Sequence, residues 1–282
     1  MQLNDRALLV QLSISQWSAR KYDKRVTKDV TSAHGANMAA GRFNKSLLPM
    51  SDLLDAVHRK TSAIRQKYYI NTLPWGMDGT QMLPTANYLA FMSDFRTEKA
   101  EWEQLVDQFL GSYDYLKANA QKALGTLYSP EDYPSVLQVR TKFSMDLAVL
   151  PVPSGDFRVD LGSAELTRIR QDVERRVEEA GQAAMRDVWQ RLYDRVQHVA
   201  EKLSDPEGIF RDSMVEHTRE LCALLPRLNF ADDPDLEAMR QQVEASLVKH
   251  PEVLRSNPDI RRDTAAEAKR IMDQMGAFMG GL

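Results

Sequence analysis

The chain has 282 residues, of which 43% are hydrophobic and 27% are charged, and its formal net charge is -3. This length suffices for one large core or two smaller ones. The sequence lacks a secretory signal pattern and any run of about 18 apolar residues that could cross a membrane. A single cysteine, Cys222, excludes an internal disulfide and both common zinc spacings. We therefore expect a cytoplasmic protein that contacts no membrane.

Charge is distributed unevenly along the chain. Residues 1–75 hold 12 Lys and Arg against 5 Asp and no Glu, a net charge of +7. The remaining 207 residues carry 25 basic and 35 acidic side chains, a net charge of -10. This asymmetry indicates that the N-terminal quarter faces something anionic, either a nucleic acid or the acidic half of a neighbouring subunit. Helices that simply differ in charge would produce the same pattern.

The first part of the chain predicts mixed secondary structure. Residues 7–15 alternate apolar and polar side chains, which predicts a strand with one buried face. Residues 18–46 are basic, weakly periodic and rich in small residues, which favours a loop or a loosely helical arm. Ser51 caps a predicted helix that continues to Tyr69. A second helix, with aromatic residues recurring on one face, follows Pro84.

Residues 68–84, YYINTLPWGMDGTQMLP, separate these two helices. Pro74 and Pro84 restrict the backbone φ angle, and Gly79 can adopt a positive φ. The rings of Tyr69 and Trp75 are large enough to wedge between helices. This composition predicts that residues 70–84 form a rigid connector that sets an interhelical angle. The alternative is a stacking platform that exposes the rings of Tyr68, Tyr69 and Trp75.

The second part of the chain predicts a hairpin followed by helices. Residues 142–161 alternate around a PSGD turn and predict a β-hairpin, which we expect to join strand 7–15 in a small antiparallel sheet. Apolar residues then recur at steps of three and four over residues 163–203, which predicts one helix of about 40 residues, roughly 60 Å long. Its apolar stripe must be buried by three shorter helices that follow or by another copy of the chain.

Two of those shorter helices have clear start signals. Asp233-Pro234 and Asn257-Pro258 each place a capping side chain before a proline in the first helical turn. The tail, GAFMGGL, is expected to be frayed. The predicted fold class is mainly α (α+β), with a mixed α/β domain over residues 1–161 and a helical domain over residues 162–282.

Motifs that would indicate catalysis or a metal site are not found in the sequence. GRFNKS (41–46) ends in Lys-Ser like a phosphate-binding loop, but Asn44 precedes the lysine and no apolar strand precedes the segment. The five histidines stand at least 19 residues apart, which leaves no pair at ligand spacing. Cys222 lies in an apolar helical turn, where a buried and inert thiol is expected. We expect neither an enzyme nor a bound cofactor.

Basic and aromatic side chains are interleaved near the N-terminus, where Trp17 and Tyr22 accompany the cations. Single-stranded nucleic acid requires cations along its backbone and flat rings for its bases, at roughly 1–3 kcal/mol per stacked base. The ordinary interpretation places such aromatics in the core and such charges on a solvated face. The candidate nucleic-acid-binding residues are Arg20, Lys21, Lys24, Arg25, Lys28, Arg42, Phe43, Lys45, Arg59, Lys60, Arg65, Lys67, Tyr68, Tyr69 and Trp75.

Four motifs occur in order along the chain: GRFNKSLLP, NTLPWGMDGTQMLPTANYLAFM, YPSVLQVRTKFSMDLAVLPVP and FRDSMVEHTRELCALLPRLNFADDP. Over roughly residues 1–245 the sequence resembles a family of unknown function carried by bacteriophages and other mobile elements. Genes of family members look like neighbours of genes for MoxR-type AAA+ ATPases, for von Willebrand A-domain proteins or for phage DNA metabolism. The resemblance therefore implies that the protein works with a partner. It implies no catalytic residues.

Two functions are consistent with these patterns. In the first, a non-enzymatic phage protein binds nucleic acid, specifically single-stranded DNA, as a self-associating homo-oligomer in the host cytoplasm. In the second, an adaptor or scaffold docks an AAA+ ATPase or another phage protein without nucleic acid. We favour the first. Inhibition of a host defence system is neither supported nor excluded by the sequence.

Overall fold

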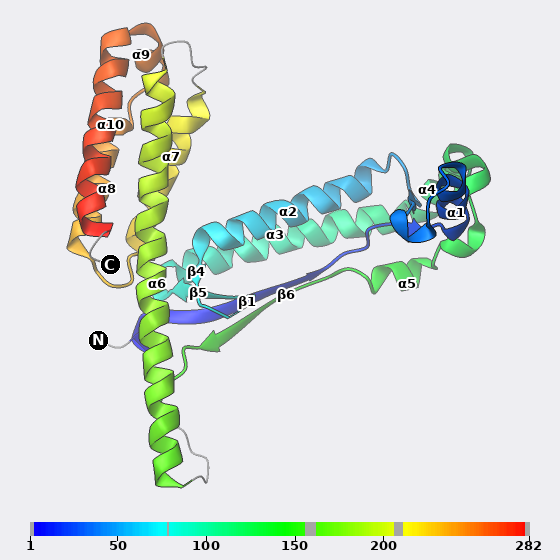
Figure 1. Ribbon diagram of the computed structural model, residues 1–282, viewed down its shortest axis with the longest axis horizontal. Helices are drawn as coiled ribbons and strands as arrows, with labels where there is room; N and C mark the ends of the chain where they lie inside the picture. The colour runs from blue at the N-terminus through cyan, green and yellow to red at the C-terminus, as the bar shows by residue number, and fades with distance from the viewer. Residues whose placement is uncertain (1–2, 78, 156–161, 206–210, 280–282) are drawn as a thin grey trace. The chain divides into compact units, whose positions relative to one another are not determined.

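The computed structural model describes residues 3–77, 79–155, 162–205 and 211–279 (Figure 1). The fold is mainly α with a small sheet, as predicted. Contacts divide the chain into two compact units, which are described separately. Unit 1 comprises residues 1–11, 67–92 and 148–282, and unit 2 comprises residues 12–66 and 93–147.

Four strands form the larger sheet, in the order β4-β5-β1-β6. Their bounds are β1 Ala7–Ser15, β4 Leu73–Pro74, β5 Thr80–Pro84 and β6 Ser144–Pro151. Strand β1 runs antiparallel to β5, from Ala7 opposite Pro84 to Gln11 opposite Thr80. The predicted strand over residues 7–15 is confirmed, as is its place beside the first arm of the predicted hairpin. The second arm falls within residues 156–161, outside the described residues.

The predicted connector over residues 70–84 contains two strands that the sequence did not indicate, β4 and β5. Gly76 and Gly79 take positive φ angles between them, a conformation that glycine adopts without strain. Trp75 and Tyr68 are buried, and the Tyr68 hydroxyl donates to the Val10 carbonyl over 2.8 Å. The rings of Tyr68 and Trp75 are therefore not exposed, contrary to the stacking-platform alternative.

Unit 1 is built around one long helix, α6, which runs from Ser163 to Ser204 as predicted. Helices α7 (Asp212–Leu228), α8 (Pro234–Leu247), α9 (Pro251–Ser256) and α10 (Pro258–Met279) follow it. Helix α10 packs along α6 and α8, and α7 packs against α8 (Figure 1). These helices bury the apolar stripe of α6 from Ala180 to Leu203, whereas Leu166, Ile169, Val173 and Val177 are half-buried.

Side-chain caps begin the last helices where the sequence predicts them. Asp233 Oδ1 accepts from the backbone N–H groups of Asp235 and Leu236, and Asn257 Oδ1 accepts in the same way at the start of α10. Residues 276–279 of the tail are not frayed as expected, because α10 continues to Met279; residues 280–282 lie outside the described residues. Near its end Phe278 stacks on the buried Trp189, with ring centroids 5.6 Å apart.

Arg191 of α6 binds the chain where helix α2 (Asp52–Asn71) ends and β4 begins. Its guanidinium donates to the carbonyl oxygens of Tyr69, Ile70 and Thr72 and also pairs with Asp187. A helix C-terminus leaves carbonyl groups without intrahelical partners, and a forked guanidinium satisfies several of them at once. This contact fixes α6 against the beginning of β4.

Unit 2 combines parts of two long helices with several short elements. Trp102 of α3 (Thr85–Gly111) donates its indole N–H to Thr61 of α2, and the buried rings of Trp17, Phe109 and Tyr113 meet in tilted and edge-to-face contacts. The short elements are β2 (Arg20–Tyr22), α1 (Lys24–Ala33), β3 (Asn44–Ser46), α4 (Tyr113–Leu124) and α5 (Val136–Arg140), with 3-10 turns η1 (Leu3–Asp5, in unit 1), η2 (Met38–Ala40), η3 (Gly125–Leu127) and η4 (Pro130–Asp132).

Residues 18–46 do not form the loop or loose arm that we expected. Strands β2 and β3 pair as an antiparallel ribbon, and α1 lies between them in sequence. The buried face of α1 is formed by Thr27 and Thr31, whose hydroxyls donate to backbone carbonyls one turn earlier. Since threonine is not apolar, a search for apolar periodicity does not detect this helix.

Candidate nucleic-acid interface

The ribbon β2–β3 and helix α1, residues 20–46, form what we call the basic module. Seven of its side chains are Lys or Arg and two are Asp, a net charge of +5. Eight of the candidates named above fall in this short segment: Arg20, Lys21, Lys24, Arg25, Lys28, Arg42, Phe43 and Lys45. The ribbon register places Arg20 opposite Ser46, Lys21 opposite Lys45 and Tyr22 opposite Asn44. Two lysines thus face each other across the strands.

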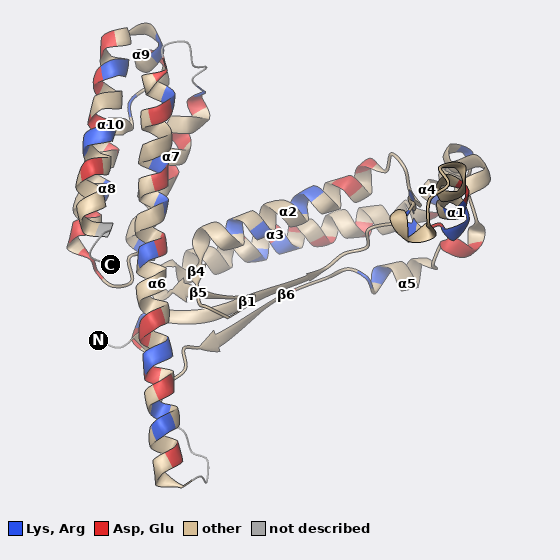
Figure 2. Ribbon diagram, viewed as in Figure 1, with Lys and Arg blue, Asp and Glu red and all other residues tan. Residues whose placement is uncertain are grey.

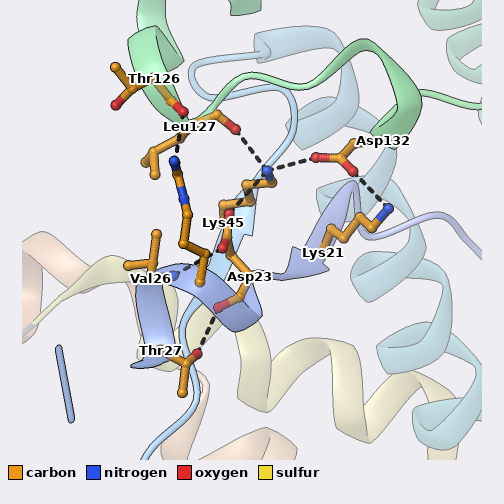
Figure 3. Close-up of polar contacts among 9 residues, drawn as sticks. Lys21, Asp23, Val26, Thr27, Lys45, Thr126, Leu127 and Asp132 are labelled. Carbon is orange, nitrogen blue, oxygen red and sulfur yellow. Dashed lines mark hydrogen bonds and ion pairs between the residues drawn. The ribbon is translucent and has the colours of Figure 1, made fainter. Parts of the chain in front are cut away.

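One carboxylate resolves the repulsion between these lysines. Asp132 of η4 lies between them, with Oδ1 2.7 Å from Lys21 Nζ and Oδ2 2.7 Å from Lys45 Nζ (Figure 3). Lys45 also donates to the Leu127 carbonyl over 2.7 Å and lies 3.2 Å from Asp23 Oδ2. Its side chain is only 7% exposed. A cation this buried persists in a protein only when it is paired and hydrogen-bonded.

Asp23 joins this ion-pair cluster to α1. Its other oxygen, Oδ1, accepts from the Val26 backbone N–H over 3.1 Å and so caps the helix. The backbone N–H of Asp23 donates to the Phe43 carbonyl, and the Phe43 N–H donates to the Thr27 hydroxyl. Arg25, in the first turn, donates to the Thr126 carbonyl over 3.1 Å. The cluster therefore connects both strands of the ribbon, the helix and residues 126–132.

The protonation states of the cluster follow from its contacts. Burial alone would lower the pKa of Lys45, but hydrogen bonds and charge contacts with Asp132 and Asp23 outweigh burial and raise it. Burial alone would raise the pKa of Asp132. Hydrogen bonds and charge contacts with Lys21 and Lys45 outweigh this effect, so the pKa of Asp132 is lowered. The pKa of Asp23 is lowered first by the Val26 N–H and then by Lys45. Lys45 is therefore a stable ammonium, unsuited to act as a base or nucleophile.

The remaining cations of the basic module differ from the ion-paired arginines of α6. Among the described residues, Arg20, Lys24, Lys28 and Arg42 form no ion pair with a carboxylate, and all four are exposed. On α6, by contrast, basic and acidic residues alternate (Figure 2), and Arg175 pairs with both Asp172 and Glu179 at helical spacing. The module thus presents positive charge that the described part of its own chain does not neutralise.

An arginine and a tyrosine of the module are in direct contact. The Arg42 guanidinium carbon lies over the Tyr22 ring, 4.8 Å from its centroid. Tyr22 is half-buried and Arg42 is exposed, and Phe43 beside them is half-buried. This distance is within the range in which a cation is attracted to the face of an aromatic ring.

The other candidate residues are not part of the module. Lys60 of α2 is held by Glu98 and Glu101 of α3; its pKa is raised because these contacts outweigh the effect of burial. Arg59 and Arg65 are exposed on α2. Lys67, Tyr68, Tyr69 and Trp75 belong to unit 1, where Tyr68 and Trp75 are buried and Tyr69 is 54% exposed.

The two carboxylates of the ion-pair cluster, Asp23 and Asp132, were not predicted from the sequence. The capping role of Asp23 had a detectable signal, an Asp directly before a basic helical turn. Asp132 had none, since its partners lie 87 and 111 positions earlier in the sequence. Only the fold brings it to the ribbon.

Chemistry of other kinds has no support in the described residues. No group of three or more His, Cys, Asp or Glu side chains there could hold a metal ion. Cys222 is buried as predicted, and burial raises the pKa of its thiol to about 11, so the reactive thiolate is scarce. Within the same residues, none of the helices is both apolar enough and long enough to cross a bilayer.

Comparisons with known protein families, with curated proteins and with solved structures give no match for this chain. The family resemblance described above remains an expectation, and function has to be argued from the geometry.

Proposed function

We propose that the basic module binds single-stranded nucleic acid through its phosphates and that the protein catalyses no reaction on it. The observation that carries this proposal is the group of four exposed cations without carboxylate partners in the described residues, Arg20, Lys24, Lys28 and Arg42. Such cations release the counterions of a polyanion without first breaking ion pairs of their own. The resemblance to a family whose members look like neighbours of phage DNA-metabolism genes agrees with this function.

The internal ion pairs make the proposal more specific. Lys45 neutralises Asp23 and shares Asp132 with Lys21, so the acidic groups of the cluster are already engaged. The four exposed cations therefore form no ion pair with these carboxylates, while the cluster holds the ribbon and α1 in place. A rigid support reduces the conformational entropy that binding costs.

Fluorescence anisotropy with a labelled oligonucleotide of about 20 nucleotides tests the proposal. About four phosphate contacts give a slope of log K against log[salt] near -3, or roughly 50-fold weaker binding at about 200 mM than at about 50 mM salt. The double variant Lys24→Ala/Lys28→Ala should reduce that slope by about 1.4. Arg59→Ala/Arg65→Ala, on α2, is the matched control and should leave the slope unchanged. Absence of binding at about 50 mM salt would refute the proposal.

Self-association is the other part of the favoured hypothesis and stays a prediction. Mass photometry with and without the oligonucleotide measures it directly. A species of one chain mass under both conditions would remove this part and leave nucleic-acid binding untouched.

Docking of a partner protein is a second candidate function, supported by one observation in unit 1. A groove of about 670 Å³ has a largely apolar lining that includes Val177, Met185 and Phe230. Glu174 and Glu178 also line the groove, and they form no ion pair with the described residues. Apolar surface edged by free carboxylates is complementary to a basic amphipathic segment of a partner.

Site-specific crosslinking in the host tests this second function. A photo-reactive residue replacing Gln182, in the groove, should capture one partner with a basic amphipathic segment. The capture should be lost in Glu174→Lys/Glu178→Lys and kept in the control Glu220→Lys, on α7. Equal capture by both variants would exclude the groove as the docking site.

A further inference from the structure

The contact between Arg42 and Tyr22 has no evident role in holding unit 2 together. Arg42 is exposed and forms no ion pair with the described residues, and its guanidinium carbon lies 4.8 Å from the centre of the Tyr22 ring. At an exposed site a cation–π contact contributes only about 0.5–1 kcal/mol. The contact does, however, position a flat cation at the surface of the basic module.

The backbone around this pair is well defined. Tyr22 ends β2 opposite Asn44 of β3, and Arg42 lies two residues before Asn44. Between them the Phe43 carbonyl accepts from Asp23 and the Phe43 N–H donates to Thr27, with N–O distances of 2.9 and 3.0 Å. Both members of the pair are therefore attached to hydrogen-bonded backbone, and a ligand would meet them already in place.

We propose that the Arg42–Tyr22 pair is a stacking site for one unpaired nucleobase. This inference rests on the nucleic-acid binding proposed above and adds the part of the ligand that is recognised. The tyrosine supports the guanidinium from one side, and the exposed side of the guanidinium receives the base. Arginine planes and aromatic rings are the groups on which proteins stack splayed bases. The neighbouring cations, Lys24 and Lys28, bind the phosphates.

The geometry selects single strands over duplexes. A base in a duplex is already stacked and paired, and its extrusion costs a few kcal/mol. A base of a single strand can occupy the site without that cost. Since stacking uses the face of the base, which all bases share, the site recognises an unpaired base without reading its identity.

The experiment uses the full chain and an oligonucleotide with 2-aminopurine at successive positions, in DNA and RNA forms. Stacking on the pair should quench 2-aminopurine fluorescence on binding. Arg42→Lys retains the charge and removes the planar group. It should abolish the added quenching and weaken single-strand binding about 5- to 10-fold, with an unchanged salt slope. Arg59→Lys, at an exposed position of α2 outside the basic module, is the matched control and should match the wild-type protein.

A second variant removes the other half of the pair. Tyr22→Leu should also abolish the quenching, and Arg42→Lys, at an exposed position, keeps the test valid if Tyr22→Leu fails to fold. Salt-dependent binding with equal quenching in Arg42→Lys and wild type would overturn the stacking site alone. Absence of any binding would overturn the proposed function, so the two failures are distinguishable.

Discussion

Replacement of Lys45 by methionine is the most informative change to the basic module. Methionine has a similar length but no charge, so Asp23 and Asp132 lose the cation that they share. The side chains of Lys45, Asp132 and Asp23 are 7%, 9% and 11% exposed. Removing one member of a buried ion pair costs about 3–5 kcal/mol. Because Lys21 still pairs with Asp132, we expect the lower value, about 3 kcal/mol of unfolding free energy.

Urea denaturation followed by tryptophan fluorescence measures this loss, with hydrogen exchange over residues 20–46 reporting on the module itself. Lys21→Met is the matched control. Lys21 faces Lys45 across the ribbon and contacts the same carboxylate, but its side chain is 49% exposed. Loss of an exposed pair costs at most about 1 kcal/mol. Equal destabilisation by the two variants would show that burial of Lys45 does not matter.

The effect of Lys45→Met should depend on pH. The pKa values of Asp23 and Asp132 are lowered in the folded protein. Their contribution to stability is therefore complete above the unfolded value of about 4 and is lost as the pH falls through the lower folded values. The difference between wild type and Lys45→Met should shrink below about pH 4. A difference that stays constant from neutral to acidic pH would refute the assigned ion pairs.

Three further predictions concern unit 1. Arg191→Ala should lower the unfolding free energy by about 2 kcal/mol, because three carbonyl groups lose their hydrogen-bond donor. Arg191→Lys should recover little of this loss, because a lysine lacks the forked guanidinium. An unchanged urea midpoint in Arg191→Ala would contradict the contact. Asp233→Ala should lower the unfolding free energy by about 1–2 kcal/mol, because α8 loses its cap. Asp235→Ala, one position beyond the proline, should lower it less. Urea denaturation measures both variants. The Cys222 thiol should react with a disulfide reagent only at the rate of unfolding, and rapid reaction in the native protein would show that it is accessible.

Much of the helical architecture could be predicted because its signals are local. Helix α6 has an apolar stripe at a constant spacing, and the starts of α8 and α10 have a capping side chain next to a proline. These features depend on residues a few positions apart. The strand over residues 7–15 was predicted for the same reason, from alternation within nine residues.

The elements that the sequence did not indicate depend on distant partners or on polar burial. Strand β4 has two residues and becomes a strand only because β5 pairs with it, while β5 depends on β1, over 60 positions earlier in the chain. Helix α1 buries threonines in place of apolar residues. Composition alone could not distinguish the buried Lys45 from the exposed Lys28, because the difference lies in Asp132.

The same dependence on distant residues suggests an order of events during folding. While residues 20–46 are being synthesised, the two facing lysines repel each other and Asp132 has not yet left the ribosome. The ribbon should therefore close only after the chain has returned through residue 133, where Tyr133 also donates to the Leu47 carbonyl. We expect a nascent chain stalled before residue 126 to be cleaved by protease within residues 20–46, and a chain stalled with residue 147 outside the ribosome to be protected there. Unit 2 would then fold late and in one step, when its second segment, residues 93–147, joins its first segment, residues 12–66.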